Sequence, residues 1–281
     1  MAAFDDIDIL LLNNRPNENF LGLTPTEVEY LLYDTFSERS ILKFSNDLDD
    51  STLDQIPLFR IAEEYLKIIQ RDNQIKLTPL GALPRKIMVE LYDKRILLDE
   101  HIESGLIKLW KEQDCISIAN ARFTTELAGL VRKANGKLNL TKKSVKLLQV
   151  ENRIQLFKVF FQAFTEKLLW GSNDGYPDKT VGQLGWAFSV YMLMKFGNQA
   201  NTTDFYAEKY LKAFPNFITF FKPGYSTPER QCAHCYGIRT FNRFLLWFGF
   251  VTVERQKHYL DLETAKFTIT EVVNKIFTFE D

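Results

Sequence analysis

The chain has 281 residues, a length that suits one large domain or two ordinary ones. Its composition, 46% hydrophobic and 25% charged, is typical of a folded globular protein, and 24 Phe predict a core rich in aromatic rings. The 35 basic and 36 acidic side chains exclude the general basic excess of many nucleic-acid-binding proteins, but they leave room for a local basic patch. Three Cys exclude a disulfide framework and favour a reducing compartment.

Residues 1–53 are expected to hold an N-terminal arm and the first helix. Thr24 is followed by Pro25 and, three residues after Thr24, by Glu27. This is the order of a helix start, with a threonine N-cap, a proline at the first helical position and a glutamate that completes a capping box. We therefore predict that residues 1–23 are extended and that a helix begins at Pro25.

A short motif recurs three times after residue 54. Each copy is a helix, a turn, an apolar-x-apolar-Thr stretch and a second helix, and the three stretches end at Thr78, Thr141 and Thr270. Each Thr stands where its side-chain oxygen could cap the helix that follows. A helix that leads into a small β-hairpin and then another helix is the order of a winged-helix module. In the third copy a polar tip at residues 256–261 would join the two strands.

The alternative is that three Thr-capped helices recur by chance, because Thr is a common cap. The winged-helix interpretation predicts two winged-helix-like units within residues 54–150 and a third at 226–281. Between them, residues 151–225 form a helical block with a dense aromatic stripe at Phe157, Phe160, Phe161 and Phe164. We expect this block to be the hydrophobic centre against which the units pack. The expected fold class is mainly α (α+β), with small β-hairpins.

Membrane association is not expected. The longest uncharged stretch, residues 180–194, is shorter than the roughly 20 residues that a membrane-spanning helix needs, and we interpret it as a central buried helix. Acidic residues of the N-terminal arm stand where a secretory signal would carry positive charge. Together with the low Cys content, this predicts a cytoplasmic protein.

Four stretches together resemble a group of uncharacterised bacterial proteins. They are residues 13–33 (NNRPN…GLTP…LLY), 77–86 (LTPLGALPRK), 174–196 (DGYPD and the helix after it) and 205–215 (FYAEKYLKAFP). The similarity would span most of the chain. It implies a bacterial cytoplasmic protein and supplies no catalytic residues, since the group has no assigned activity.

Standard catalytic and cofactor motifs are missing from the sequence. It has no phosphate-binding Gly-Lys-Ser/Thr loop, dinucleotide glycine fingerprint, Gly-x-Ser-x-Gly elbow or His-Glu-x-x-His motif. Cys232, His234 and Cys235 form the most metal-like string, but a tetrahedral zinc site needs a fourth ligand. We instead expect both thiols to be buried in a helix that begins near Pro228. No catalytic, cofactor-binding or metal-binding residue is predicted, and no cofactor.

One segment has a marked local charge. Its six basic residues, with no acidic residue between them, are Arg132, Lys133, Lys137, Lys142, Lys143 and Lys146. In a winged helix they would lie on surfaces that can meet a phosphate backbone, where each neutralised phosphate releases counterions. Against this, a charged run is usually a solvated face, and the segment holds no aromatic side chain to stack on a base.

Three functions therefore stay open, with binding favoured over catalysis. The first is a non-enzymatic protein that contacts nucleic acid through residues 132–146. The second is a protein-interaction or scaffold role, in which a partner or a second copy covers the surface aromatics Phe220, Phe221 or Tyr225. The third is an enzyme of unfamiliar type with a pocket near residues 171–178. Its candidate residues are Trp170, Tyr176 and Trp186 as lining, with Asp174 or Asp178 as the acid–base group.

Overall fold

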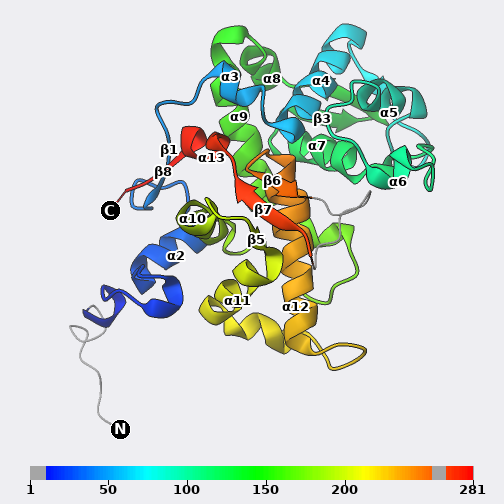
Figure 1. Cartoon of the computed structure of the whole chain (residues 1–281). Helices are drawn as coiled ribbons and strands as arrows, with labels where there is room; N and C mark the ends of the chain where they lie inside the picture. Colours follow the sequence, from blue (N-terminus) through cyan, green and yellow to red (C-terminus); the bar gives the residue numbers. More distant parts are fainter. Residues whose placement is uncertain (1–10, 255–263, 281) are drawn as a thin grey trace. The chain divides into compact units, whose positions relative to one another are not determined.

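Helices and short strands form two separately packed units in the computed structural model, which describes residues 11–254 and 264–280 (Figure 1). Unit 2 consists of Leu48–Asn173 together with Trp247–Gly249, and unit 1 takes the described residues on either side of these segments. Helices predominate in both units and the strands form small antiparallel sheets, so the predicted mainly α (α+β) fold class is confirmed. The polar tip predicted at residues 256–261 lies outside the described residues.

The main elements of unit 2 follow one another in a simple order. They are α3 (Asp50–Leu53), α4 (Pro57–Asp72), β2 (Ile75–Lys76), α5 (Arg85–Tyr92), α6 (Glu100–Glu103), α7 (Ile116–Leu127), β3 (Val131–Ala134), β4 (Lys137–Leu140), α8 (Lys142–Leu147) and α9 (Arg153–Gln162). The strands form one antiparallel sheet in the order β2-β4-β3. Asn135 and Gly136 both have positive φ, as a tight hairpin turn between β3 and β4 requires.

β2 and β4 are neighbours in this sheet, with Ile75 opposite Leu138. The repeated motif in the sequence predicts these two strands in separate winged-helix-like units, whereas in the structure they belong to a single three-stranded sheet. Thr141 caps α8 as predicted, because its side chain accepts a hydrogen bond from the Ser144 N–H. Thr78 does not cap a helix. Its hydroxyl accepts from the Ala82 N–H in a turn, and α5 begins only at Arg85.

Unit 1 is formed by segments that come before and after Leu48–Asn173 in the sequence. Its main elements are a 3₁₀ helix (Glu18–Phe20), α2 (Pro25–Tyr33), β1 (Leu42–Phe44), α10 (Trp186–Phe196), β5 (Asn201–Thr202), α11 (Thr203–Ala213), α12 (Pro228–Tyr236) with its π-helical continuation Gly237–Leu245, β6 (Val251–Glu254), β7 (Lys266–Ile269), α13 (Glu271–Ile276) and β8 (Phe277–Phe279). One sheet has the order β5-β7-β6, and β1 pairs with β8.

Two local predictions in unit 1 have different outcomes. The capping box of α2 is confirmed, since Thr24 and Glu27 bond reciprocally and Pro25 is the first helical residue. The prediction of an extended segment before it is wrong for Glu18–Phe20, which form a 3₁₀ helix. The buried helix expected over residues 180–194 begins only at Trp186, because Gly182 and Gly185 take positive φ in the turns before it.

Each unit buries its own aromatic cluster. In unit 2, Phe161 and Phe164 pack on Phe248 with ring centroids 5.1 and 4.9 Å apart. In unit 1, Tyr210 stacks on Tyr236 at 4.4 Å. The segment predicted as one central block, residues 151–225, is thus divided, with residues up to 173 in unit 2 and the rest in unit 1. None of the described helices is both long and apolar enough to cross a membrane.

The two three-stranded sheets are built alike. In each unit a helix leads to the first strand, two further main helices precede a strand pair, and a last helix follows. The third strand lies between the first and the second in both sheets. The backbone bonds agree as well, since the Thr141 N–H donates to Leu130 O and the Thr270 N–H donates to Phe250 O, both at 3.0 Å. The repeated pattern in the sequence therefore corresponds to a repeated strand arrangement.

Candidate nucleic-acid interface

The strands of unit 2 alternate between a buried and a solvent-facing side. Ile75, Val131 and Leu138 are buried. The residues between them point to the other side of the sheet, because side chains alternate along a strand. This solvent-facing side, called the outer face below, carries Lys76, Arg132, Ala134, Lys137 and Asn139. The outer face thus presents three cations, an amide and one small apolar side chain.

Two of these cations are paired across the strands. Lys76 lies directly opposite Lys137 in the β2–β4 pair. Like charges at directly opposite positions destabilise a sheet, because their Cβ atoms are only about 5 Å apart. Within the described part of the chain, no carboxylate forms an ion pair with Lys76, Arg132 or Lys137. An anion from outside this unit would relieve the repulsion.

The structure brings together only part of the predicted basic segment. Arg132 and Lys137 lie on the outer face, whereas Lys133 lies on the other side of the sheet, opposite Leu138. Lys142, Lys143 and Lys146 are exposed on α8, whose buried residues are Ser144 and Leu147. Lys143 is held in place, since its ammonium donates to Ala128 O at 3.0 Å.

Sequence reasoning missed Lys76. It lies 56 positions before Arg132 in the chain, so a search for consecutive charges does not find it. The alternation Ile75-Lys76-Leu77 gave the available signal, because it marks Lys76 as the outward residue of a strand. Its position opposite Lys137 depends on the sheet order, which that alternation does not determine.

The helix that precedes the strand pair of unit 2, α7, is almost wholly buried. Its exposed side chains are Phe123 and Leu127, at 44% and 42% exposure. Its one cation, Arg122, is buried and donates to Glu112 at 2.6 Å and to Glu126 at 2.7 Å. In helix-turn-helix proteins a comparable helix reads base edges with polar side chains. α7 offers no such side chain to a groove.

The equivalent sheet of unit 1 has a different outer surface. At the positions equivalent to Lys76 and Arg132 it carries Thr202 and Thr252. Its one cation, Lys266, lies opposite Glu254 in the strand pair. The same strand arrangement therefore exists without a basic face, so the cations of unit 2 are not required by the fold.

In the loop at residues 171–178, both aspartates considered as acid–base groups are bonded to other residues of unit 1. The Asp174 carboxylate accepts from Arg239 at 2.7 and 2.9 Å and from Arg243 at 3.0 Å. Burial alone would raise the pKa of Asp174, but hydrogen bonds and charge from Arg239, with the charge of Arg243, lower it. Asp174 is thus an ionised partner of two arginines. Asp178 is bonded to the N–H groups of Thr180 and Val181 in a turn.

The aromatic residues proposed to line that pocket are packed elsewhere. Trp170, in unit 2, donates its ring N–H to Phe164 O and packs on the Phe164 ring. Trp186, in unit 1, is buried against other rings of its own unit. Tyr176 lies beside His234, with its hydroxyl 2.5 Å from Nδ1. Trp170 and Trp186 are thus core residues of their own units, and Tyr176 attaches its loop to α12 through His234.

Other predicted residues have clear positions. Cys232 and Cys235 are both fully buried in α12, and burial raises the pKa of each thiol to about 12. A reactive thiolate is thus disfavoured at either cysteine.

The three aromatics considered for a protein interface differ in exposure. Phe221 is buried, whereas Phe220 and Tyr225 are exposed.

A family model described as the Y4jL N-terminal domain matches residues 54–153. The matched range begins directly after α3 and ends at the first residue of α9, and it contains the whole β2-β4-β3 sheet and the predicted basic segment. The description names a domain and no activity. The match agrees with the expected similarity to an uncharacterised family over this part of the chain. No curated protein and no solved structure matches the chain.

Proposed function

We propose that unit 2 is a winged-helix-like module that binds the phosphate backbone of double-stranded nucleic acid, as a non-enzymatic binding protein. The outer face is the main contact, and the exposed lysines of α8 add positive charge beside the hairpin. The order of elements from α4 to β4 and the sheet order β2-β4-β3 support the winged-helix interpretation. In such a module the strand pair is the wing, an element that can lie along a backbone.

The observation that carries this proposal is the composition of the outer face. It joins Lys76, Arg132 and Lys137 from three strands, with no neutralising carboxylate among the described residues. Because Lys76 and Lys137 repel each other, the arrangement has a cost in stability that a bound phosphate would offset. Each phosphate that is neutralised also releases condensed counterions, which drives binding at low salt.

The proposed contact does not depend on nucleotide sequence. Readout of bases in the major groove uses polar side chains on a helix or strand that enters the groove. The exposed side chains of α7 are Phe123 and Leu127, and the outer face carries no aromatic ring for stacking on an unpaired base. These features favour a duplex backbone as ligand over a specific base sequence or a single strand.

The test is binding of the full chain to short fluorescent duplexes of unrelated sequence, followed by fluorescence anisotropy at one low salt concentration. We expect similar affinities for all duplexes. The double variant K76T/R132T places on the outer face the threonines found at the equivalent positions of unit 1. Loss of two phosphate contacts should weaken binding by about tenfold or more.

The matched control is Lys266→Thr in the sheet of unit 1, which should leave the affinity unchanged. Circular dichroism and unfolding curves of each variant show whether it is folded. The proposal is rejected if the folded K76T/R132T variant binds duplexes as tightly as the unchanged chain, or if K266T weakens binding equally.

A further inference from the structure

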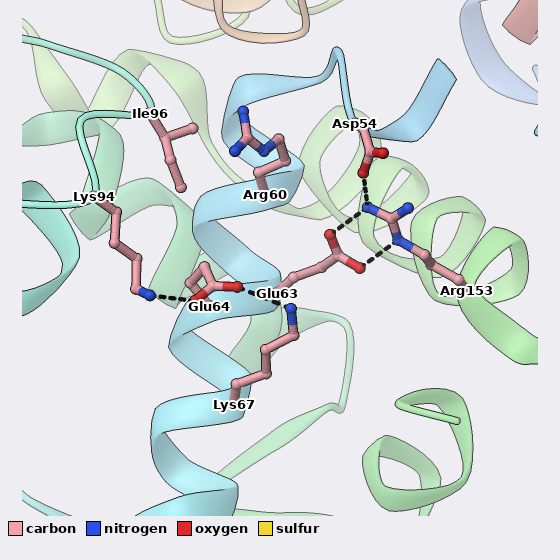
Figure 2. A pocket seen from close by; sticks show the side chains of 8 residues that line it. All are labelled: Asp54, Arg60, Glu63, Glu64, Lys67, Lys94, Ile96 and Arg153. Atoms are coloured by element: carbon pink, nitrogen blue, oxygen red, sulfur yellow. Dashed lines mark hydrogen bonds and ion pairs between the residues drawn. The ribbon is translucent and has the colours of Figure 1, made fainter. Parts of the chain in front are cut away.

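Unit 2 also has a pocket whose residues are separate from those of the outer face. Its volume is about 380 Å³, which is large enough for a small ligand. Four side chains from one side of α4 line it, together with Asp54, Lys94, Ile96 and Arg153 (Figure 2). Seven of the eight lining residues are charged, so the pocket suits a small hydrophilic ion and not an apolar molecule.

The carboxylates of the pocket already form ion pairs with its cations. Lys67 and Lys94 approach the two oxygens of Glu64, at 2.8 and 2.6 Å (Figure 2). Burial would raise the pKa of Glu64, but the hydrogen bonds and charges of the two lysines lower it, so this carboxylate is ionised. Both of its oxygens are thus engaged by cations.

Arg153 satisfies the other side of the pocket. Its guanidinium donates to both oxygens of Glu63 at 2.7 and 2.9 Å, and to Asp54 at 2.8 Å. This fork geometry is the strong form of an arginine–carboxylate pair. Five of the six carboxylate oxygens in the pocket are bonded to its cations and the sixth belongs to Asp54, so few acceptors are left for an incoming cation.

Hydrogen-bond donors are left over. Arg60 is exposed, and its guanidinium makes no hydrogen bond or ion pair within the part of the chain that the structure describes (Figure 2). Lys67 and Lys94 each have three N–H donors, of which Glu64 engages one apiece. Four cations against three carboxylates also leave a net charge of +1.

The backbone beside the pocket has an unusual conformation. Arg95 has φ of 54°, in the left-handed region that non-glycine residues rarely adopt. Lys94 and Ile96, on either side of it, both line the pocket. Arg95 itself is drawn away by its ion pair with Glu103 at 2.7 Å. The turn at Arg95 therefore places the ammonium donor of Lys94 and the apolar side chain of Ile96 in the lining of the same pocket.

We propose that this pocket binds a small oxyanion, a phosphate or carboxylate group, which Arg60 holds together with the free donors of Lys67 and Lys94. The site depends on unsatisfied donors and a positive balance, and it does not require the outer face to bind nucleic acid. Phosphate and carboxylate share the chemistry of charged oxygens that accept several hydrogen bonds, and a titration separates them.

The experiment is isothermal titration calorimetry of the full chain with inorganic phosphate and, separately, with succinate, using sodium chloride at matched ionic strength as the blank. We expect saturable heat for at least one of the two anions and none for chloride. Arg60→Gln should weaken the bound anion by about tenfold or more, since a charge-assisted bond is lost. Arg60 has no partner in the unit, so this variant should fold normally.

Arg132→Gln is the matched control, because it removes an arginine of the same unit from the outer face. It should leave the calorimetric affinity unchanged while it weakens duplex binding. The inference is overturned if neither anion gives saturable heat, or if R60Q and R132Q weaken anion binding to the same degree. If R132Q loses duplex binding but keeps anion binding, the result supports the proposed function of the outer face and says nothing against this pocket.

Discussion

The sheet β2-β4-β3 of unit 2 and the sheet β5-β7-β6 of unit 1 share strand order and cross-strand register, but their exposed sides differ. Lys76 and Arg132 in one stand where the other has Thr202 and Thr252. The comparison distinguishes the features that the strand arrangement requires from side chains that can differ without changing it. Buried alternation and the hairpin are common to both units, whereas the basic face is an addition to one of them.

A second parallel between the units is a buried arginine–carboxylate pair. In each unit, the helix that precedes the strand pair (α7 in unit 2, and α12 with its π-helical continuation in unit 1) contains a buried arginine that is paired with a carboxylate from an earlier part of the chain. In unit 2 this pair is Arg122 with Glu112, and in unit 1 it is Arg239 with Asp174. Both arginines also donate to backbone carbonyls, Arg122 to Gly81 and Arg239 to Val181 and Asp178. These pairs fix loops to helices.

The largest effect is expected from breaking these buried pairs. Asp174→Asn should destabilise the protein by about 3–5 kcal/mol, because it leaves the buried Arg239 guanidinium without its charged partner. Glu112→Gln should also destabilise it, but by less, because Arg122 keeps its ion pair with Glu126 at 2.7 Å. Urea unfolding measures the change, with Glu229→Gln on an exposed site of α12 as a control expected within about 0.5 kcal/mol. If one variant were neutral, the parallel between the two units would not hold.

The pH dependence of the Asp174 pair sharpens this parallel. The pKa of Asp174 is lowered in the folded protein. The stabilisation that the ionised Asp174 carboxylate gives the folded state is therefore fully present above the ordinary aspartate pKa of about 3.9. It is lost as the pH falls through the lower pKa that Asp174 has in the folded protein. The difference in unfolding free energy between the unchanged chain and D174N should shrink on acidification. A difference that stays constant from neutral pH to pH below 3 would contradict the assignment.

The smallest effect concerns the repulsion on the outer face. Lys76→Thr should stabilise the protein by about 0.2–1 kcal/mol at low salt, because it removes a like-charge pair with Lys137. The gain should decrease as salt screens the charges. The converse variant, Thr202→Lys opposite Lys266, should be destabilising by a similar amount. Unfolding curves at two salt concentrations test both signs.

Local signals in the sequence predicted local structure well. The Thr24–Glu27 capping box and the Thr141 cap are confirmed, because each depends on residues only three positions apart. Strand β2 was also expected from its alternation, but its partner β4 lies about 60 residues later, and no local pattern encodes that pairing. The start of α10 was misplaced because uncharged residues before Trp186 form turns at two glycines.

The candidate site was predicted in part for the same reason. The run from Arg132 to Lys146 is visible in the sequence, but the fold separates it into an outer face, an opposite face and a helix. Lys76 joins the outer face only through strand pairing. The pocket of unit 2 likewise combines Asp54 and Arg153, which are 99 positions apart, through a side-chain ion pair. Such groupings follow from tertiary contacts.

The salt dependence of duplex binding tests the central claim most directly. Anisotropy titrations of the unchanged chain and of K76T/R132T, at several salt concentrations, give the slope of log affinity against log salt. Removing two phosphate contacts should make this slope shallower by about 1.8, because each contact to a duplex contributes about 0.9. Equal slopes for the two folded proteins would contradict the assignment of the outer face as the surface that holds the backbone.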